Sequence, residues 1–254
     1  MTSTVLVEVR GNVQIMTLSN PEARNAATLE MAEAMAAALD ELDSNPALQV
    51  GIVTGAGGTF CAGMDLKGFL QGKRPSIAGR GFCGLTQKPP HKPLIAAVEG
   101  YALAGGFELV LACDLIVAAR TAKFGLPEVK RGLAASAGGL LRLPKRLPYH
   151  IAMECILTGD MFGAERAHAH GLVNRLVEPG QALETALELA QAVAANGPLA
   201  LIASKRVAQE SADWPQAEMF ERQAVITTPV FASLDAREGA TAFAEKRPPV
   251  WQGV

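Results

Sequence analysis

Residues 101–115, which read YALAGGFELVLACDL, are apolar except for two carboxylates, Glu108 and Asp114. Glu108 follows the small residues at 104–106 and precedes four apolar residues. A carboxylate that stays ionised and unpaired in such surroundings costs several kcal/mol. Glu108 therefore needs a functional explanation, whereas Asp114 is expected to cap the helix before it or to pair locally.

The segments around this stretch alternate between strands and helices, which predicts an α/β fold. Strands are expected at 94–98, 115–119 and 123–125, with a loop to residue 104 and a helix from 105 to about 113. Upstream, the pattern predicts a hairpin, a helix with Thr28 as its N-cap, a buried strand and a short helix. These elements cover residues 5–9 with 13–18, 28–42, 49–54 and 65–70.

Two longer segments complete the expected organisation. Residues 71–93 hold five basic residues and four prolines, so we expect a surface segment that is mobile unless a ligand or neighbour orders it. After residue 139 the chain is expected to be mostly helical, at roughly 148–158, 163–169, 181–195, 199–210, 214–232 and 235–245. We predict an α/β core at 1–195 and a helical region at 196–254 that packs against a partner subunit.

The overall composition excludes several classes of protein. With 254 residues, 49% of them apolar and 19% charged, the chain is typical of a globular protein with one or two domains. A net charge of −2 provides no basic field for nucleic acid. Charged residues interrupt the apolar stretch at 94–119, so no membrane span or membrane partner is expected. Residues 1–12 lack signal-peptide features, and the four cysteines lack CxxC spacing, which together favour the cytoplasm.

Two places in the sequence share one design, in which a buried strand leads through small residues into the start of a helix. They are CAGMDL after the strand at 49–54 and LAGGFEL after the strand at 94–98. Small residues let a ligand approach the backbone closely, and the first turn of a helix has unpaired N–H groups. The amides of Met64 and Gly105 are therefore candidates for an oxyanion hole, although either loop alone is more often a simple tight turn.

Glu128, in AKFGLPEVKRGL, is a second candidate acid. It lies twenty residues beyond Glu108, across a pair of short strands that would return the chain to the same cleft. Two carboxylates in one cleft can divide acid and base roles, because burial and mutual repulsion separate their pKa values. Taken alone, Glu128 would more simply form a surface salt bridge with Lys130 or Arg131.

Other functional motifs fail on their spacing. GAGGTF is not a dinucleotide-binding GxGxxG, because Phe60 occupies the position of the last glycine. AASAG lacks the first glycine of a nucleophile elbow around Ser136, and no suitable late histidine follows it. His168 and His170 are two residues apart and point to different faces of a helix, which favours a helix end over a metal site. No metal is therefore expected.

Several spaced motifs together resemble the crotonase superfamily and, within it, the enoyl-CoA hydratases. The segments that carry this resemblance are FCAGMDL, IAAVEGYALAGGFELVLACDLIVAA, AKFGLPEVKRGL, AGGLLRLPKRLP and AHGLVNRLV. LRLPKRLP and AFAEKRPPVWQG look most like the carnitinyl-CoA dehydratase branch. The resemblance implies a crotonase (ClpP-like) spiral of ββα units, a C-terminal helical trimerisation region, and a homotrimer or homohexamer. It also implies an acyl-CoA thioester as substrate and no separate cofactor.

The resemblance further implies roles for individual residues. The thioester carbonyl would lie between the Met64 and Gly105 amides, while Glu108 deprotonates the attacking water and Glu128 protonates the α-carbon of the enolate. Further residues would contact coenzyme A, two of them from the C-terminal helix and across a subunit boundary. These substrate-binding residues are Arg24, Ala62, Asp65, Leu66, Lys67, Phe243 and Lys246.

The sequence leads to a hydratase but leaves alternatives open. They are carnitinyl-CoA dehydratase (crotonobetainyl-CoA hydratase), an enoyl-CoA isomerase of the same superfamily, and a CoA-thioester binder without turnover. The presence of both Glu108 and Glu128 argues against the binder. Many hydratases have Pro-Gly or Pro-Asp where this chain has Ala135-Ser136, so the acyl pocket is expected to differ. Acyl-chain length and pathway, whether fatty-acid or other metabolism, remain open.

Overall fold

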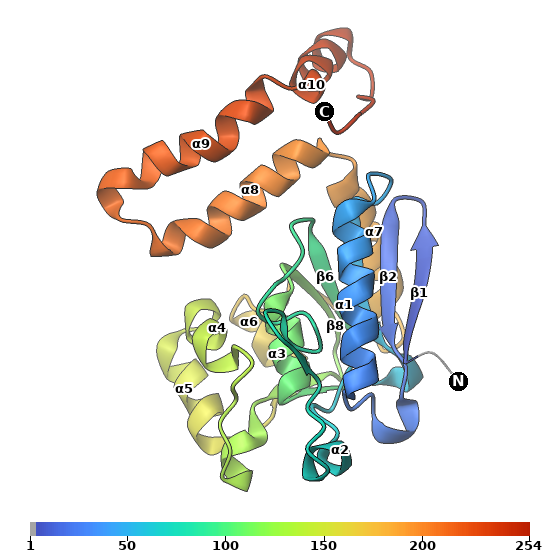
Figure 1. Ribbon diagram of the computed structural model, residues 1–254, viewed down its shortest axis with the longest axis vertical. Coiled ribbons are helices and arrows are strands. Elements are labelled where there is room, and N and C mark those ends of the chain that lie inside the picture. Colours follow the sequence, from blue (N-terminus) through green and yellow to red (C-terminus); the bar gives the residue numbers. More distant parts are fainter. Residues whose placement is uncertain (1–3) are drawn as a thin grey trace.

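A six-stranded sheet forms the centre of the molecule (Figure 1). The computed structural model describes residues 4–254. In spatial order the strands are β1 (Val5–Arg10), β2 (Val13–Leu18), β3 (Val50–Gly55), β6 (Leu94–Val98), β8 (Leu115–Ala119) and β11 (Arg175–Val177). The pair β1–β2 is the predicted antiparallel hairpin, and every later neighbouring pair is parallel.

A second, three-stranded sheet is built by the segments that follow the central strands. It contains β7 (Tyr101–Leu103), β9 (Lys123–Gly125) and β10 (Phe162–Gly163). Because β7 follows β6 and β9 follows β8, successive units of the chain give one strand to each sheet. This is the repetition that the predicted spiral requires. The loop expected before residue 104 instead contains β7, which pairs in parallel with β9.

Helices cover both faces of the central sheet. Ile15, Ile52 and Ile95 lie opposite one another on adjacent strands and pack against α7 (Ala182–Ala194). Met16 and Val53, one residue further along, point to the other face and join the core with α1 (Leu29–Ser44) and α3 (Gly105–Ala112). This alternation follows from the two-residue period of a strand. It buries the sheet on both sides, as parallel sheets require.

The remaining helices form two groups. Near α3 lie α4 (Gly139–Arg146), α5 (Tyr149–Thr158) and α6 (Ala164–Ala169), while α2 (Leu66–Leu70) lies at the bottom of Figure 1. At the top, α8 (Pro198–Glu210), α9 (Met219–Phe231) and α10 (Leu234–Glu245) form an arm that extends from the body. The boundary expected at 195/196 falls between α7 and α8, and the two-part division remains a prediction. Helix α4 was not expected, and it contains Pro144.

Within residues 4–254, no single helix has the length and apolar character needed to cross a membrane. Ala182–Ala194 and Pro198–Asp213 pass that test only as a pair, and they are bent by 105° at the break between them.

The segment at 71–93 is a surface segment for only part of its length, and the neighbour that orders it is α1. The segment contains the short strands β4 (Ser76–Ile77) and β5 (Gly81–Phe82), and Cys83, Leu85 and Thr86 are buried. Gly84 explains the close packing: its φ is 65°, and a Cβ there would lie 2.7 Å from the carbonyl oxygen of Ala32 on α1. The basic and proline-rich composition concealed a stretch that is folded against α1.

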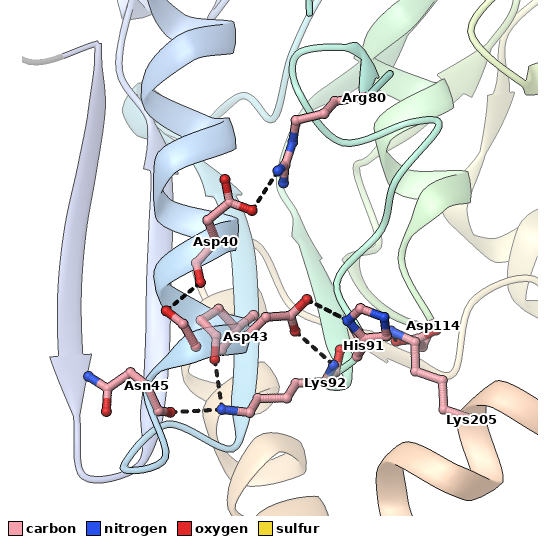
Figure 2. A network of polar contacts seen from close by, with 10 residues as sticks. Asp40, Asp43, Asn45, Arg80, His91, Lys92, Asp114 and Lys205 are labelled. Carbon is pink, nitrogen blue, oxygen red and sulfur yellow. Dashed lines mark hydrogen bonds and ion pairs between the residues drawn. The ribbon is translucent and has the colours of Figure 1, made fainter. Parts of the chain in front are cut away.

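Buried and partly buried polar contacts connect this segment and the arm to the body (Figure 2). The Lys92 ammonium donates hydrogen bonds to the carbonyls of Leu42 and Asn45 at the end of α1, at 2.8 and 2.7 Å. Lys205 on α8 forms an ion pair with Asp114 at 2.6 Å, and the same carboxylate oxygen accepts the Leu94 N–H. The expected local pairing of Asp114 is therefore wrong, because its partner comes from the arm.

Candidate active site

The two loops predicted to form an oxyanion hole lie side by side. The Cys61 N–H donates to the carbonyl of Tyr101, and the Leu103 N–H donates back to the carbonyl of Cys61, at 2.9 and 3.0 Å. Glycine is required where the loops meet, since a Cβ on Gly106 would lie 2.1 Å from the Cys61 carbonyl oxygen. The small residues in both motifs therefore allow the close approach of the two loops.

The amides of Met64 and Gly105 are both available to a ligand. Within residues 4–254 neither N–H donates a hydrogen bond to the protein. The β-bridge between Ala27 and Met64 uses the N–H groups of Ala27 and Asp65, and Gly105 is the first residue of α3. Ala104, just before α3, has φ 52° and ψ −130°, a rare conformation for a residue with a side chain. Strain of this kind is often found at functional sites. The two free N–H groups have the character of oxyanion donors.

Glu108 lies in the first turn of α3 and is only 3% exposed. Its Oε1 accepts hydrogen bonds from the backbone N–H groups of Ala137 and Gly139, at 2.7 and 2.8 Å. Burial raises the pKa of this carboxyl, while the two N–H donors and the nearby charge of Arg142 oppose the rise. The carboxyl is thus held in one orientation by donors that favour its ionised form.

Glu128 follows Pro127 in a short 3-10 helix, Pro127–Arg131. Burial, together with the charge of Glu108, raises its pKa to about 7. Its Oε2 is buried and finds no hydrogen-bond partner among residues 4–254. The simpler surface salt bridge is not formed, because Lys130 pairs with Asp160 instead. Glu128 is therefore easier to protonate than an ordinary glutamate.

One cavity of about 480 Å³ brings these groups together. Six predicted residues line it, namely Ala62, Met64, Leu66, Gly105, Glu108 and Glu128. Apart from Ser136, the sequence did not single out any of the remaining lining residues as a site residue. Most of them come from 69–87 and 131–137, and they include Phe69, Arg74, Ser76, Phe82, Gln87, Arg131, Leu133 and Ser136. Ser136 belongs to the Ala135-Ser136 step that had been expected to alter the acyl pocket. The sequence places residues 71–93 at the border of the acyl pocket, but their composition does not show which side chains line the cavity.

Other predicted residues lie outside this cavity. The Arg24 guanidinium lies over the ring of Tyr101, 5.7 Å from its centroid. The Asp65 carboxylate caps α2 by accepting the N–H groups of Lys67 and Gly68, both at 3.1 Å. With Lys67 it lines a smaller pocket of about 170 Å³ next to α2. Within one chain these residues flank the cavity without entering it.

The two predicted residues of α10 are far from the cavity. In Figure 1, α10 lies at the top of the arm, whereas α2 and α3 lie in the lower part of the body. The Phe243 side chain is 87% exposed, and Lys246 is the left-handed C-cap of α10, with φ 55°. Within a single chain the structure does not bring either residue to the cavity.

In the part of the chain that the structure describes, the histidines and acids show no arrangement for a metal. No group of three or more His, Cys, Asp or Glu side chains within residues 4–254 is placed to hold a metal ion. His168 is in the last turn of α6, where its ring contacts the carbonyl of Val173 at 2.8 Å. The predicted catalytic groups that line the cavity are the two carboxyl groups and the residues that carry the two backbone amides.

Comparison with known proteins identifies relatives along nearly the whole chain. The family model for enoyl-CoA hydratase/isomerase matches residues 8–254. An enoyl-CoA hydratase of Mycobacterium tuberculosis is 44% identical over 254 aligned residues, which cover 97% of this chain and 96% of the relative. A carnitinyl-CoA dehydratase of Salmonella typhi is 43% identical, with 96% of each chain covered.

Solved structures give the same result for the fold. A crystal structure of enoyl-CoA hydratase from Mycobacterium tuberculosis superposes with a TM-score of 0.98 at 57% identity, covering 99% of this chain and all of the other. A carnitinyl-CoA hydratase from Mycobacterium avium superposes with a TM-score of 0.80 at 43% identity, covering all of both chains. The crotonase resemblance and the predicted fold class are confirmed.

Proposed function

This chain belongs to the enoyl-CoA hydratase/isomerase family, and we propose that it reversibly adds water across the 2,3 double bond of a 2-enoyl-CoA thioester. The observation that carries the proposal is the pairing of two carboxyl groups with opposite surroundings in one cavity. Glu108 accepts two N–H donors, whereas a buried oxygen of Glu128 has no partner in the described chain. Such a pair supplies a base and an acid at the same pH.

The reaction follows from this arrangement. Glu108 takes a proton from water while the water oxygen bonds to C3 of the enoyl group. The electron pair of the double bond moves through C2 onto the thioester oxygen, where the amides of Met64 and Gly105 stabilise the enolate charge. As the carbonyl re-forms, C2 takes the proton of Glu128. Glu108 ends protonated and Glu128 ionised, and exchange with solvent restores both.

We further propose that coenzyme A enters with the thioester and that no other cofactor takes part. Ala62 and Leu66 line the cavity itself, Asp65 and Lys67 lie beside its α2 wall, and Arg24 lies over Tyr101 of β7. On this proposal, the first two flank the thioester and the other three lie along the coenzyme. Phe243 and Lys246 reach the coenzyme only from a neighbouring subunit, since they lie on the distant arm.

We propose that the arm assembles the chain into a homotrimer, or a homohexamer of two trimers. Apolar side chains stand exposed on α9 and α10, among them Phe220 (83% exposed), Phe231 (81%) and Phe243 (87%). An exposed apolar surface of this kind is typical of an interface. Size-exclusion chromatography with light scattering should give three or six times the 26.6 kDa chain mass. A monomer would contradict the proposal.

We also propose that the protein acts in the cytoplasm. Cys61, Cys83, Cys113 and Cys155 are all buried and free of disulfides, which is typical of reducing compartments. Fractionation of the source cells with an antibody against the chain would test this location. A signal in the extracellular fraction would contradict it.

The cavity walls favour a neutral acyl group over the cationic tail of crotonobetainyl-CoA. Among the lining residues, Glu108 and Glu128 are the only carboxylates, and both are needed for the chemistry. Two arginines, Arg74 and Arg131, add positive charge to the wall. A trimethylammonium group placed there would lack a counter-charge of its own. We therefore place enoyl-CoA hydratase ahead of carnitinyl-CoA dehydratase.

The decisive assay follows the loss of enoyl-thioester absorbance. Crotonyl-CoA, a medium-chain 2-enoyl-CoA and crotonobetainyl-CoA are each mixed with the protein. Glu108→Gln and Glu128→Gln should each lower kcat by roughly 10²–10⁴-fold, as expected for loss of a general base or acid. Glu188→Gln, at an exposed surface pair with Arg175, is the matched control. Preference for crotonobetainyl-CoA would support the carnitine branch, and binding without turnover would refute the hydratase function.

A further inference from the structure

The two amides that hold Glu108 come from a tight turn at residues 137–139. Gly138, at the centre of the turn, has φ 104° and lies between the Ala137 and Gly139 donors. The position of each N–H therefore depends on the conformation of this turn. A small rotation at Gly138 would remove one donor or both from Glu108.

Arg142, one turn into α4, holds this loop from two directions. Its backbone N–H donates to the carbonyl of Gly138 at 2.9 Å. Its guanidinium covers the open side of the same residue, because a Cβ on Gly138 would lie 2.1 Å from Nη1 of Arg142. The side chain thus occupies the space that the missing Cβ leaves free.

The same guanidinium reaches the segment that contributes Phe82 and Gln87 to the cavity lining. Nη2 of Arg142 donates to the carbonyl of Thr86 at 2.6 Å. The Thr86 hydroxyl accepts the Phe82 N–H at 2.9 Å, and the Phe82 ring packs on Gly105, where a Cβ would lie 2.5 Å from the ring. One side chain therefore connects the loop that holds Glu108 to the residue that packs on the oxyanion amide.

We propose that Arg142 is a positioning residue, which fixes the two N–H donors of Glu108 and, through Thr86 and Phe82, the amide of Gly105. The inference rests on the proposed hydratase function for its kinetic consequence, but the geometry it describes does not. The charge of Arg142 also acts on Glu108 and favours the ionised form of that carboxyl. Glu128 shares the cavity with Glu108 and lies near Arg131, and Arg74 also lines this cavity.

The test compares Arg142→Gln and Arg142→Lys with Lys145→Gln, which removes one charge from an exposed position of the same helix. Arg142→Gln should lower kcat about 10–100-fold with KM within about threefold, the effect expected when a reacting group is misplaced. The acid limb of its pH–rate profile should move up by about one pH unit, because a nearby positive charge is lost. Arg142→Lys should keep the acid limb in place but regain only part of kcat, since an ammonium lacks the planar fork.

A titration without turnover separates this proposal from the proposed function. The side-chain carboxyls are labelled with ¹³C-glutamate, and the Glu108 signal is assigned with Glu108→Gln. Because Glu108 and Glu128 are coupled, the Glu108 signal should titrate in two steps. The midpoint of the step at lower pH should rise by about one pH unit in Arg142→Gln and should not change in Arg142→Lys or Lys145→Gln. This result would stand even if the wild-type protein hydrated no thioester.

Two outcomes would overturn the role of Arg142. In the first, Arg142→Gln keeps the kcat and Glu108 midpoint of Lys145→Gln. In the second, Arg142→Gln loses kcat together with thermal stability while the Glu108 midpoint is unmoved, which would make Arg142 a purely structural residue. If Arg142→Gln does not fold, Arg142→Lys decides: a wild-type kcat would refute the need for the guanidinium.

Discussion

Replacing Glu128 with glutamine should make the protein more stable at high pH while removing its activity. In the folded protein, burial and the charge of Glu108 raise the pKa of Glu128 from 4.5 to about 7. The folded state therefore binds a proton more tightly than the unfolded state. The stability from this proton is fully present below pH 4.5 and is lost as the pH rises to about 7. A glutamine side chain does not titrate, so its contribution to stability does not change with pH.

The size of the effect follows from the shift. A rise from 4.5 to about 7 corresponds to about 3 kcal/mol at most, at about 1.4 kcal/mol per pH unit. Solvent reaches part of this carboxyl, and screening reduces the value to about 1–2 kcal/mol. Relief of the repulsion on Glu108 acts in the same direction. The stability of Glu128→Gln relative to wild type should thus increase by about 1–2 kcal/mol between pH 5 and pH 8.

Urea unfolding at pH 5 and pH 8 measures this difference, with the protein concentration held constant because assembly contributes to stability. Glu188→Gln, at an exposed ion pair of α7, should shift by less than about 0.5 kcal/mol between the two pH values. If Glu128→Gln changed the stability equally at both pH values, folding would not raise the pKa of Glu128. If Glu128→Gln were less stable relative to wild type at pH 8 than at pH 5, folding would lower the pKa of Glu128 instead of raising it.

Three further results are expected. Hydration of crotonyl-CoA should slow above about pH 7, about tenfold per unit, because Glu128 must be protonated to donate its proton; a flat profile to pH 9 would contradict this role. Gly106→Ala would place a Cβ 2.1 Å from the Cys61 carbonyl oxygen. Its free energy of unfolding in urea should therefore fall by about 1–3 kcal/mol, and the absorbance assay should show a severe loss of kcat. Lys205→Met, which leaves a partly buried carboxylate unpaired, should cost about 1–3 kcal/mol, whereas Arg206→Met at the neighbouring exposed pair should cost less than about 0.5 kcal/mol.

The features that sequence predicted well are those set by local pattern. Alternation of apolar residues located the hairpin of β1 and β2, and the Thr28 hydroxyl accepts the Met31 N–H as the predicted N-cap of α1. The two small-residue motifs also lie together, because glycines such as Gly106 leave room for a neighbouring carbonyl. In each case a few adjacent residues determine the outcome.

Contacts between distant segments were not predictable in the same way. Asp114 pairs with Lys205, ninety-one residues along the chain, and nothing near Asp114 in the sequence identifies that partner. The basic segment at 71–93 folds against α1 because Gly81 and Gly84 adopt positive φ. Composition records the charges of such a segment but not the turns that bury its remaining residues.

The same distinction explains why the roles of the two acids could be assigned by resemblance but not by spacing. Both are glutamates that follow small or turn-forming residues, and twenty residues of sequence separate them. What distinguishes them is that the turn at 137–139 gives two N–H donors to Glu108 and none to the buried Oε2 of Glu128 among the residues described. Hydrogen bonds to the ionised form favour a base, whereas burial without them favours an acid. The turn at 137–139 therefore determines that Glu108 is the base and Glu128 the acid. Arg142 is the side chain that holds this turn in place.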